Sequence, residues 1–248
     1  MSVPVSPSLP LGALLKPTKE TKKLTKALKR STPRISAEVP AAVDLLSNLG
    51  PLRHQGARGT CLSFAATALH EYNYRPNHSA KDFSEQFLYA RIKSIDSHAG
   101  VCRTWLAYAI KALNDLGQCS RQTWSYNPNL PCNDTSPEPT GADAEALNFR
   151  MQARMLSAKS VRQIKGALIS NSVVPISIPV YDSWYKSPEF HRTGRITMTV
   201  GNEPVVSSHC VCVAGFQNIY DWPGGGCFIF RNSWGTGWAP DSPYSAGN

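Results

Sequence analysis

The chain has 248 residues, 42% hydrophobic and 17% charged, with a formal net charge of +9. This length suits one domain or two small lobes with a sizeable core, and the ordinary composition excludes fibrous and wholly disordered classes for the body. No run approaches the ~18 apolar residues needed to cross a bilayer, so we expect no transmembrane segment.

Residues 1–34 carry most of this charge. They hold eight Lys or Arg against Glu20 alone, a net charge of +7 that leaves +2 for the rest of the chain. Their many Pro, Ser and Thr residues predict a flexible arm with a short basic helix near 19–30. We expect a solubilising extension or a contact with an acidic surface. Because no aromatic residue accompanies the lysines, specific nucleic-acid binding is not expected.

Residues 1–15 lack the features of a Sec-type signal peptide, because prolines interrupt the apolar stretch and no Lys or Arg precedes it. Localisation therefore stays open between the cytoplasm and another export route. The chain has seven cysteines. Without a signal peptide we expect mostly reduced thiols, although six of them could pair.

The body begins near residue 40, and its hydrophobic periodicity changes along the chain. Helical spacing predicts helices at residues 61–75, 83–92, 103–116 and 160–169, with Pro76 and Asn77 ending the first. Four prolines make residues 127–141 a long loop. Later runs rich in β-branched residues predict strands at residues 173–181, 194–200, 205–215 and 227–232. Helices followed by strands indicate an α+β protein, with a helical lobe at about residues 50–127 and a β lobe at about 142–238.

Three short motifs lie on these elements. Gln55 precedes Cys61 by six residues in the motif QGARGTC, ahead of an apolar helical run. His209 opens HCVCVAGF, and Asn232 opens NSWGTGW. In this chain order the motifs resemble those of the papain-like cysteine peptidases, and the resemblance extends with gaps from about residue 40 to residue 238.

The resemblance implies a papain-like two-lobed fold over residues 35–248, with the active-site cleft between the lobes. It implies a cysteine endopeptidase that hydrolyses peptide bonds through a thioester on Cys61. His209 would act as acid and base, and Asn232 would fix the tautomer and orientation of its imidazole. A peptide or protein substrate and a monomer are expected, with no cofactor.

Three further residues take roles from the same resemblance. Gln55 would donate a hydrogen bond to the oxyanion together with the backbone N–H of Cys61, a contact whose loss costs about 10²–10³ in rate. Trp234 would shield the histidine–asparagine contact from water. Gly100 would mark the edge that pairs with an extended substrate backbone.

The residues themselves suggest how the thiol is activated. A thiol is nucleophilic only as thiolate, and a free cysteine with a pKa near ~8.5 is mostly protonated at pH 7. Cys61 is predicted in the first turn of a helix, where unpaired backbone N–H groups carry partial positive charge. An imidazolium at His209 would add a full charge. We therefore expect a lowered pKa and faster alkylation at Cys61 than at the other six thiols.

Cys210 and Cys212 flank the predicted histidine but point away from it. Side chains alternate along a strand, so these two thiols share the face opposite His209. No second ligand pair has metal-binding spacing, and no metal site is expected. We interpret both as small buried hydrophobic residues.

The chain departs from the family pattern in several places. The resemblance implies that Arg58 occupies the position of a family cysteine that forms a disulfide, that Leu62 replaces a tryptophan, and that Ser208 and Cys210 are unusual neighbours of His209. We expect no helical propeptide of the kind that blocks the cleft in the family, since about 40 residues precede the domain. The chain ends ten residues after Trp238, where the family continues with another strand, so a truncated chain and a degenerate copy both stay open.

Two other functions stay open beside the active peptidase. One is a catalytically silent papain-like protein that only holds peptides, and the other is a basic-arm adaptor for a membrane or nucleic acid. The arm also has two interpretations. We expect that removing residues 1–34 leaves the reaction rate unchanged, as for a mere arm, whereas a several-fold rise would indicate a short segment that blocks the cleft.

Overall fold

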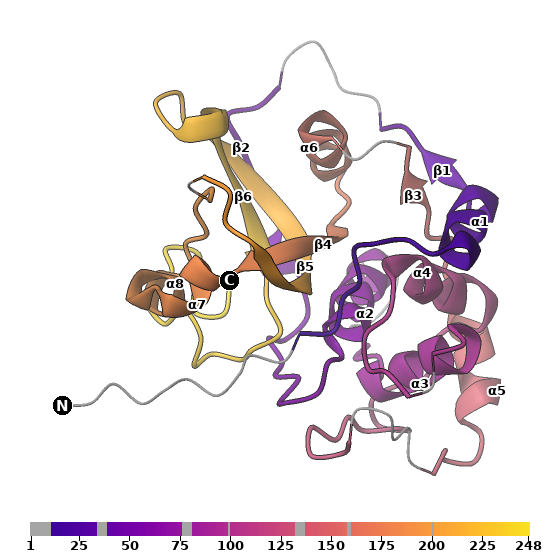
Figure 1. Ribbon diagram of the computed structural model, residues 1–248. Coiled ribbons are helices and arrows are strands. Elements are labelled where there is room, and N and C mark those ends of the chain that lie inside the picture. The colour runs from indigo at the N-terminus through magenta and orange to yellow at the C-terminus, as the bar shows by residue number, and fades with distance from the viewer. Residues whose placement is uncertain are drawn as a thin grey trace.

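The computed structural model has two lobes (Figure 1). It describes residues 11–33, 39–75, 81–98, 100–131, 137–157, 160–199 and 201–248. Helices α2 to α5 form one lobe, and the main sheet with α7 and α8 forms the other. The predicted α+β class with a helical lobe and a β lobe is confirmed. The predicted helix stop at Pro76 and Asn77 lies outside the described residues.

Helix α2 (Cys61–Tyr74) is the centre of the helical lobe. Eleven of its fourteen residues are buried, because α3 and α4 cover one side and the sheet of the other lobe covers another. It is therefore a core helix that is buried on more than one face. It begins at the predicted nucleophile.

Helices α3 (Glu85–Ile95) and α4 (Leu106–Asp115) lie within three residues of their predicted bounds. The hydroxyl of Ser84 accepts a hydrogen bond from the backbone N–H of Phe87, which caps α3. The short α5 (Ala142–Ala146) completes this lobe. Within the described residues, no helix is both long and apolar enough to span a membrane.

Strand β5 (Val205–Asn218) organises the second lobe. It pairs antiparallel with three strands, β2 (Ala42–Asp44), β4 (Val174–Tyr181) and β6 (Gly226–Arg231). Residues 208–216 are all buried, because α2 and α6 (Val161–Ile169) pack against the strand. This burial on both faces puts the middle of β5, including the predicted histidine, at the junction of the lobes.

Two short helices follow β4 where the sequence predicts a turn into another strand. They are α7 (Asp182–Lys186) and α8 (Pro188–Thr193). Ser187 caps α8, and Pro188 in the first turn favours a helix start. The predicted strand at residues 194–200 is wrong for residues 194–199, which form no strand.

Residues 11–33, predicted as part of a flexible arm, pack against both lobes. Helix α1 (Lys19–Ala27) starts with a capping box at Thr18 and contacts α4. Next, β1 (Arg30–Ser31) pairs in parallel with β3 (Met155–Leu156). Leu24 and Leu28, four residues apart, both pack against hydrophobic clusters. Burial of these two leucines favours packing of residues 11–33 against the body, which the basic, proline-rich composition of the arm does not indicate. Residues 1–10 and 34 lie outside the described part of the chain.

Candidate active site

Cys61 begins α2 at the boundary between the lobes. It follows Thr60, whose hydroxyl lies 2.7 Å from that of Tyr126 and makes no capping hydrogen bond to α2. The positive end of the helix dipole therefore lies at the sulfur. This is the position that the sequence predicts for a nucleophile. Cys61 is nevertheless fully buried, with an exposed fraction of 0%.

His209 lies on β5 and is held by residues from the turn after β6. Its Nε2 donates to Asn232 Oδ1 at 2.8 Å, which fixes the tautomer of the neutral ring. Trp234 stacks on the imidazole with ring centroids 4.6 Å apart. Asn232 is anchored through its backbone N–H, which donates to Gly247 O at 3.1 Å. The structure therefore brings together the histidine, asparagine and tryptophan that the sequence singles out.

Gln55 lies in the extended segment before α2, and both ends of its amide are held. Nε2 donates to Arg58 O at 2.7 Å, and Oε1 accepts from the hydroxyl of Ser233. The backbone N–H of Gln55 donates to Ser233 O at 2.9 Å. Ser233 directly follows Asn232, so one turn positions both the partner of His209 and the amide of Gln55.

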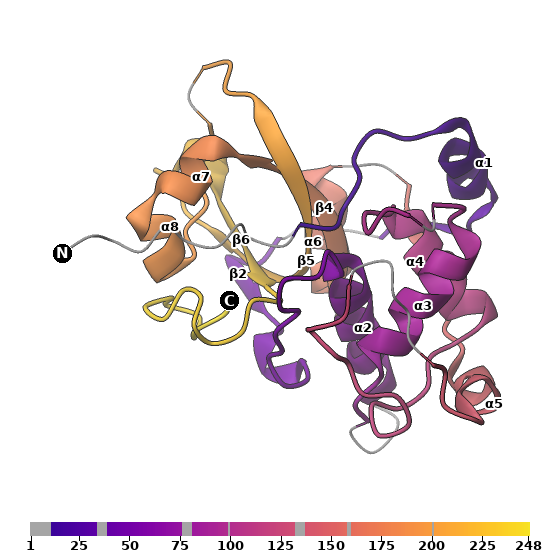
Figure 2. The same cartoon turned by 60° about the horizontal axis from the view of Figure 1, so that its bottom comes forward.

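Residues 11–14, here called the cleft segment, run between the two lobes (Figures 1 and 2). Thr104 pairs with the cleft segment through both of its backbone groups. Its N–H donates to Gly12 O at 3.0 Å, and its carbonyl accepts from Leu14 N at 2.8 Å. The cleft segment therefore forms an isolated parallel β-bridge, Ala13 with Thr104, along the edge of the helical lobe.

The cleft segment also covers the predicted nucleophile. Ser208 Oγ donates to Ala13 O from the side of the β lobe, and Ala13 is fully buried in the same hydrophobic cluster as Cys61. Gly12 passes so close to Gly59 that an added Cβ would lie 1.8 Å from Gly59 O. Only glycine fits at this point. We call this arrangement, with Cys61 covered, the closed form.

Burial sets the protonation of both reacting groups in the closed form. It raises the pKa of Cys61 to about 11, although backbone N–H groups of Cys210 and Gly12 act in the opposite direction. Burial also lowers the pKa of His209 to about 4, although its hydrogen bond to Asn232 favours the charged form. Thiol and imidazole are therefore both neutral near pH 7.

The imidazole of His209 has one unused hydrogen-bonding atom. Nδ1 is buried and has no partner among the described residues. The thiol–imidazole hydrogen bond is therefore not formed, and the lowered thiol pKa expected from the sequence is wrong for the closed form. The sulfur of Cys61 does lie beside the backbone N–H of Cys210, the residue directly after His209. The sulfur therefore lies one residue along β5 from His209, and burial keeps both side chains uncharged.

Gly100 lies in the loop before α4 and lines a cavity of about 330 Å³ together with Leu11 and Gly59. A Cβ added at Gly100 would meet nothing within 4 Å, so no close approach requires glycine there. The backbone that binds an extended segment in the closed form belongs to Thr104, four residues later. Sequence reasoning missed Thr104 because backbone pairing leaves no side-chain signature.

A comparison with protein-family models agrees with this fold. The model of the papain family of cysteine proteases matches residues 39–244. The chain belongs to this family. The papain-like fold predicted from the sequence is confirmed. None of the curated proteins that were compared matches the chain.

Solved structures of papain-family proteases share the fold at low sequence identity. Xylellain, a cysteine protease from Xylella fastidiosa, aligns with a TM-score of 0.74 and 21% identity over 95% of this chain and 90% of that one. Digestive procathepsin L 3 from the larval midgut of Tenebrio molitor gives 0.62 and 20%, over 89% and 70%. Procathepsin B from Trypanosoma congolense gives 0.61 and 15%, over 92% and 77%.

Arg58 is buried in the loop before α2 and makes several polar contacts there. Its Nη1 donates to Gln86 Oε1 at 2.7 Å and to Asn127 O at 3.0 Å, and its guanidinium lies over the rings of Tyr89 and Tyr126. These contacts tie the loop before α2 to α3 without a disulfide at this position. Elsewhere five cysteines are free thiols, namely Cys61, Cys119, Cys210, Cys212 and Cys227.

Cys210 and Cys212 have exposed fractions of 1% and 0%, as predicted for buried thiols. Within the described residues, no group of three His, Cys, Asp or Glu side chains could hold a metal ion. Cys102 is disulfide-bonded, which is one instance of the pairing that the sequence left open.

Proposed function

We propose that this papain-family protein is a cysteine peptidase with Cys61 as nucleophile, His209 as acid and base, Asn232 as the orienting group and Gln55 as an oxyanion donor. One observation carries the proposal. Asn232 and Trp234 orient the imidazole of His209, whose Nδ1 has no partner among the described residues. The next residue on β5, Cys210, contacts the sulfur of Cys61 through its backbone N–H. A stable fold does not require an oriented imidazole with a buried, unpartnered nitrogen, which costs free energy.

The proposed reaction begins when water and substrate replace the cleft segment. Hydration favours the charged forms, so His209 takes the proton of Cys61 and an ion pair results. The thiolate attacks the peptide carbonyl carbon, and the oxyanion accepts hydrogen bonds from the Gln55 amide and the Cys61 N–H. His209 then gives its proton to the leaving amine, and a thioester remains. Water, deprotonated by His209, releases the acid and restores the thiol.

We further propose that the closed form is a latent state of this enzyme. Cys61 and Ala13 are fully buried, and a peptide cannot reach the sulfur while the cleft segment pairs with Thr104. Because Gly12 leaves no room for a side chain against Gly59, the blockade depends on one glycine. This supports the interpretation of the N-terminal residues as a short blocking segment.

The test uses the full chain and a variant that opens the cleft, Gly12→Leu. Both proteins are incubated with a mixed peptide library, and the products are identified by mass spectrometry. We expect new peptide termini with Gly12→Leu and few with the wild type. The added Cys61→Ala substitution should abolish cleavage, while the matched Cys227→Ala substitution should not. If no Cys61-dependent cleavage occurs with either protein, the chain is a silent peptide-binding member of the family.

We also propose that the N-terminal region contacts an acidic surface. The exposed side chains of Lys16, Lys19, Lys22, Lys23, Lys26, Lys29 and Arg30 lie on and beside α1. Their density of positive charge favours anionic vesicles or polyanions. Binding should weaken steeply with salt, since exposed charges are screened within ~8–10 Å. Salt-independent binding would contradict this contact.

A further inference from the structure

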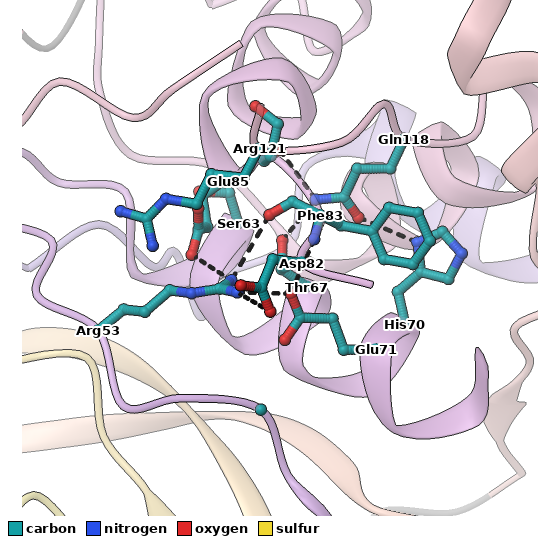
Figure 3. Close-up of polar contacts among 12 residues, drawn as sticks. Arg53, Ser63, Thr67, His70, Glu71, Asp82, Phe83, Glu85, Gln118 and Arg121 are labelled. Atoms are coloured by element: carbon teal, nitrogen blue, oxygen red, sulfur yellow. Dashed lines mark hydrogen bonds and ion pairs between the residues drawn. The ribbon is translucent and has the colours of Figure 1, made fainter. Parts of the chain in front are cut away.

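Arg53 is the centre of a buried ion cluster in the helical lobe (Figure 3). Its Nη2 lies 2.8 Å from Glu71 Oε1 and 3.1 Å from Asp82 Oδ1, and its Nη1 lies 2.7 Å from Glu85 Oε1. The side chains of Arg53, Glu71 and Glu85 are 8%, 3% and 1% exposed. The guanidinium thus joins the end of α2 to the start of α3.

Stability alone is a weak reason to bury such a cluster. Removing several charges from water costs free energy, and well-packed apolar replacements of buried ion pairs are often equally stable or more stable. Here three carboxylates surround the Arg53 guanidinium, and the second cation of the cluster, Arg121, reaches Glu85 Oε2 only at 4.0 Å. Burial raises the pKa of Glu71, with Arg53 opposing that shift. The cluster is better explained by the position that it imposes on its members.

Backbone contacts lead from Arg53 directly to the active-site turn. The carbonyl of Arg53 accepts from Gly235 N at 3.3 Å, and the N–H of Gln55 donates to Ser233 O at 2.9 Å. Between them, His54 forms an antiparallel bridge with Trp234. Residues 53–55 and 233–235 therefore lie side by side as two short extended segments. One holds the oxyanion glutamine, and the other follows Asn232.

Packing provides a second link. Arg53, Glu85, Asn232 and Ser233 all line a cavity of about 30 Å³ between the lobes. Arg53 Nε and Glu85 Oε2 are buried and have no hydrogen-bond partner among the described residues. A shorter or uncharged side chain at Arg53 would enlarge this cavity directly beside Asn232. The residue that orients His209 would then lose a packing neighbour.

We propose that Arg53 is a positioning residue, whose ion cluster holds residues 53–55 against residues 233–235 and so aligns the Gln55 amide with the Asn232–His209 pair. This inference rests on the proposed function. Arg53 itself touches neither substrate nor reacting atoms. Its effect should therefore appear in kcat, through misplacement of groups that act in the transition state, while KM stays within about two-fold.

The kinetic test is a double-mutant cycle in the full chain that carries Gly12→Leu. We expect Arg53→Met to lower kcat by roughly 10–100-fold. In the parent, Gln55→Ala should cost about 100-fold. In the Arg53→Met background it should cost less than about 10-fold, because the amide is already displaced. An undiminished 100-fold effect in both backgrounds would show that Arg53 does not position Gln55.

A second measurement does not depend on catalysis. Hydrogen–deuterium exchange at the amides of Gln55 and Gly235 in the full chain should accelerate by about ten-fold or more in Arg53→Met. The matched control is Leu113→Ala, a buried core residue of α4. It should lower the unfolding midpoint while leaving these two amides and the Gln55 effect unchanged. Unchanged exchange in Arg53→Met would overturn the inference. This outcome is distinct from failure of the proposed function, which would appear as a lack of Cys61-dependent cleavage.

Arg53→Lys is a more conservative variant, which tests the inference if Arg53→Met does not fold. It keeps the charge in the cluster, but one ammonium group cannot reproduce the planar fork that reaches Glu71 and Glu85 together. We expect folded protein, a kcat about ten-fold lower and faster exchange at Gln55. If Arg53→Lys had the parental kcat and the parental exchange rate at Gln55, a positive charge at residue 53 would suffice, and the fork geometry of arginine would not be needed to position Gln55.

Discussion

At the scale of single residues, burial keeps the proposed nucleophile and the proposed base uncharged. The pKa of Cys61 is raised to about 11 and that of His209 is lowered to about 4, both mainly by desolvation. The helix start at Cys61 and the hydrogen bond that His209 donates to Asn232 favour the charged forms, but they do not outweigh the loss of water. Under the proposed function, the burial of Cys61 and His209, and not the lack of a catalytic group, therefore limits the reactivity of the thiol.

A substitution at Gly12 should expose the thiol. In Gly12→Leu the side chain collides with the backbone of Gly59, so the cleft segment is displaced and the sulfur regains water. We expect iodoacetamide to label Cys61 at least ten-fold faster near pH 7, because the thiolate fraction rises as the pKa falls. Peptide mapping of the alkylated protein gives the rate at each cysteine. Lys26→Leu, on an exposed face of α1, should leave the rate unchanged, and equal rates in both variants would contradict the blockade.

The supporting residues should rank by what each supplies to the reaction. In the Gly12→Leu background, Asn232→Ala should reduce kcat less than His209→Ala, because orientation is lost while the base remains. Gln55→Ala should lower kcat about 100-fold with little change in KM, as expected for a group that acts only in the transition state. Steady-state kinetics on one peptide measure both. A Gln55→Ala protein with parental kcat would remove Gln55 from the oxyanion site.

At the scale of elements, residues 11–33 form a continuous unit of cleft segment, α1 and β1. Leu24 and Leu28 anchor the unit on the body, and Trp105 Nε1 donates to Lys16 O at 3.0 Å between the cleft segment and α1. Apolar burial of α1 therefore stabilises the cleft segment at a distance.

Removal of residues 1–33 should increase turnover several-fold, since α1 no longer holds the cleft segment over the thiol. The sequence alone favoured equal rates, and the contacts of Gly12, Ala13 and Leu14 are the reason to expect a rise. The unfolding temperature should fall at the same time, because the surface of α4 under α1 becomes exposed. Side-by-side rate and melting measurements decide this. Removal of residues 1–10 alone is the control. A turnover that rises in this control, and no further when residues 11–33 are also removed, would contradict the role of the cleft segment.

At the scale of the whole molecule, the closed form depends on contacts from both lobes to one segment. Thr104 belongs to the helical lobe and Ser208 to the β lobe, and each bonds to the cleft segment. His209 follows Ser208 in the chain, and in the closed form it is buried as a neutral imidazole. This burial couples the position of the segment to pH.

Acid should loosen the closed form. The pKa of His209 is lowered from its usual 6.5 to about 4, so between these values an open form takes up a proton and the closed form does not. Stability of the closed form should thus fall as pH drops from 6.5 toward 4, by on the order of a few kcal/mol, and change little below that.

Hydrogen exchange at the amide of Leu14, corrected for the intrinsic pH dependence, should report this opening. The pKa of His70 is also lowered to about 4 by burial, so His70 adds the same pH dependence to global unfolding. His70→Gln should reduce that global dependence but leave the pH dependence at Leu14. Exchange at Leu14 that does not change with pH would contradict the coupling.

Much of the site could be predicted because the relevant signals are local. Cys61 at a helix start, His209 on a strand and Asn232 before Trp234 each stand in a short motif whose chemistry depends on near neighbours in the chain. Helices α3 and α4 followed from periodicity for the same reason. The failed strand at residues 194–199 directly follows α8, whose C-terminus is capped by Gly194 with φ 71°, a left-handed backbone in which a strand does not begin.

The sequence by itself predicted the candidate catalytic residues and determined the order of the helical and β lobes. The tertiary structure decided whether those residues are accessible and how they are charged. The contact between Ser208 and Ala13 joins positions 195 residues apart, and the contact between Ser233 and Gln55 joins positions 178 apart. Local periodicity contains no information about such pairs. Because desolvation depends on which distant segment covers a group, the neutral thiol and imidazole of the closed form follow only from the folded chain.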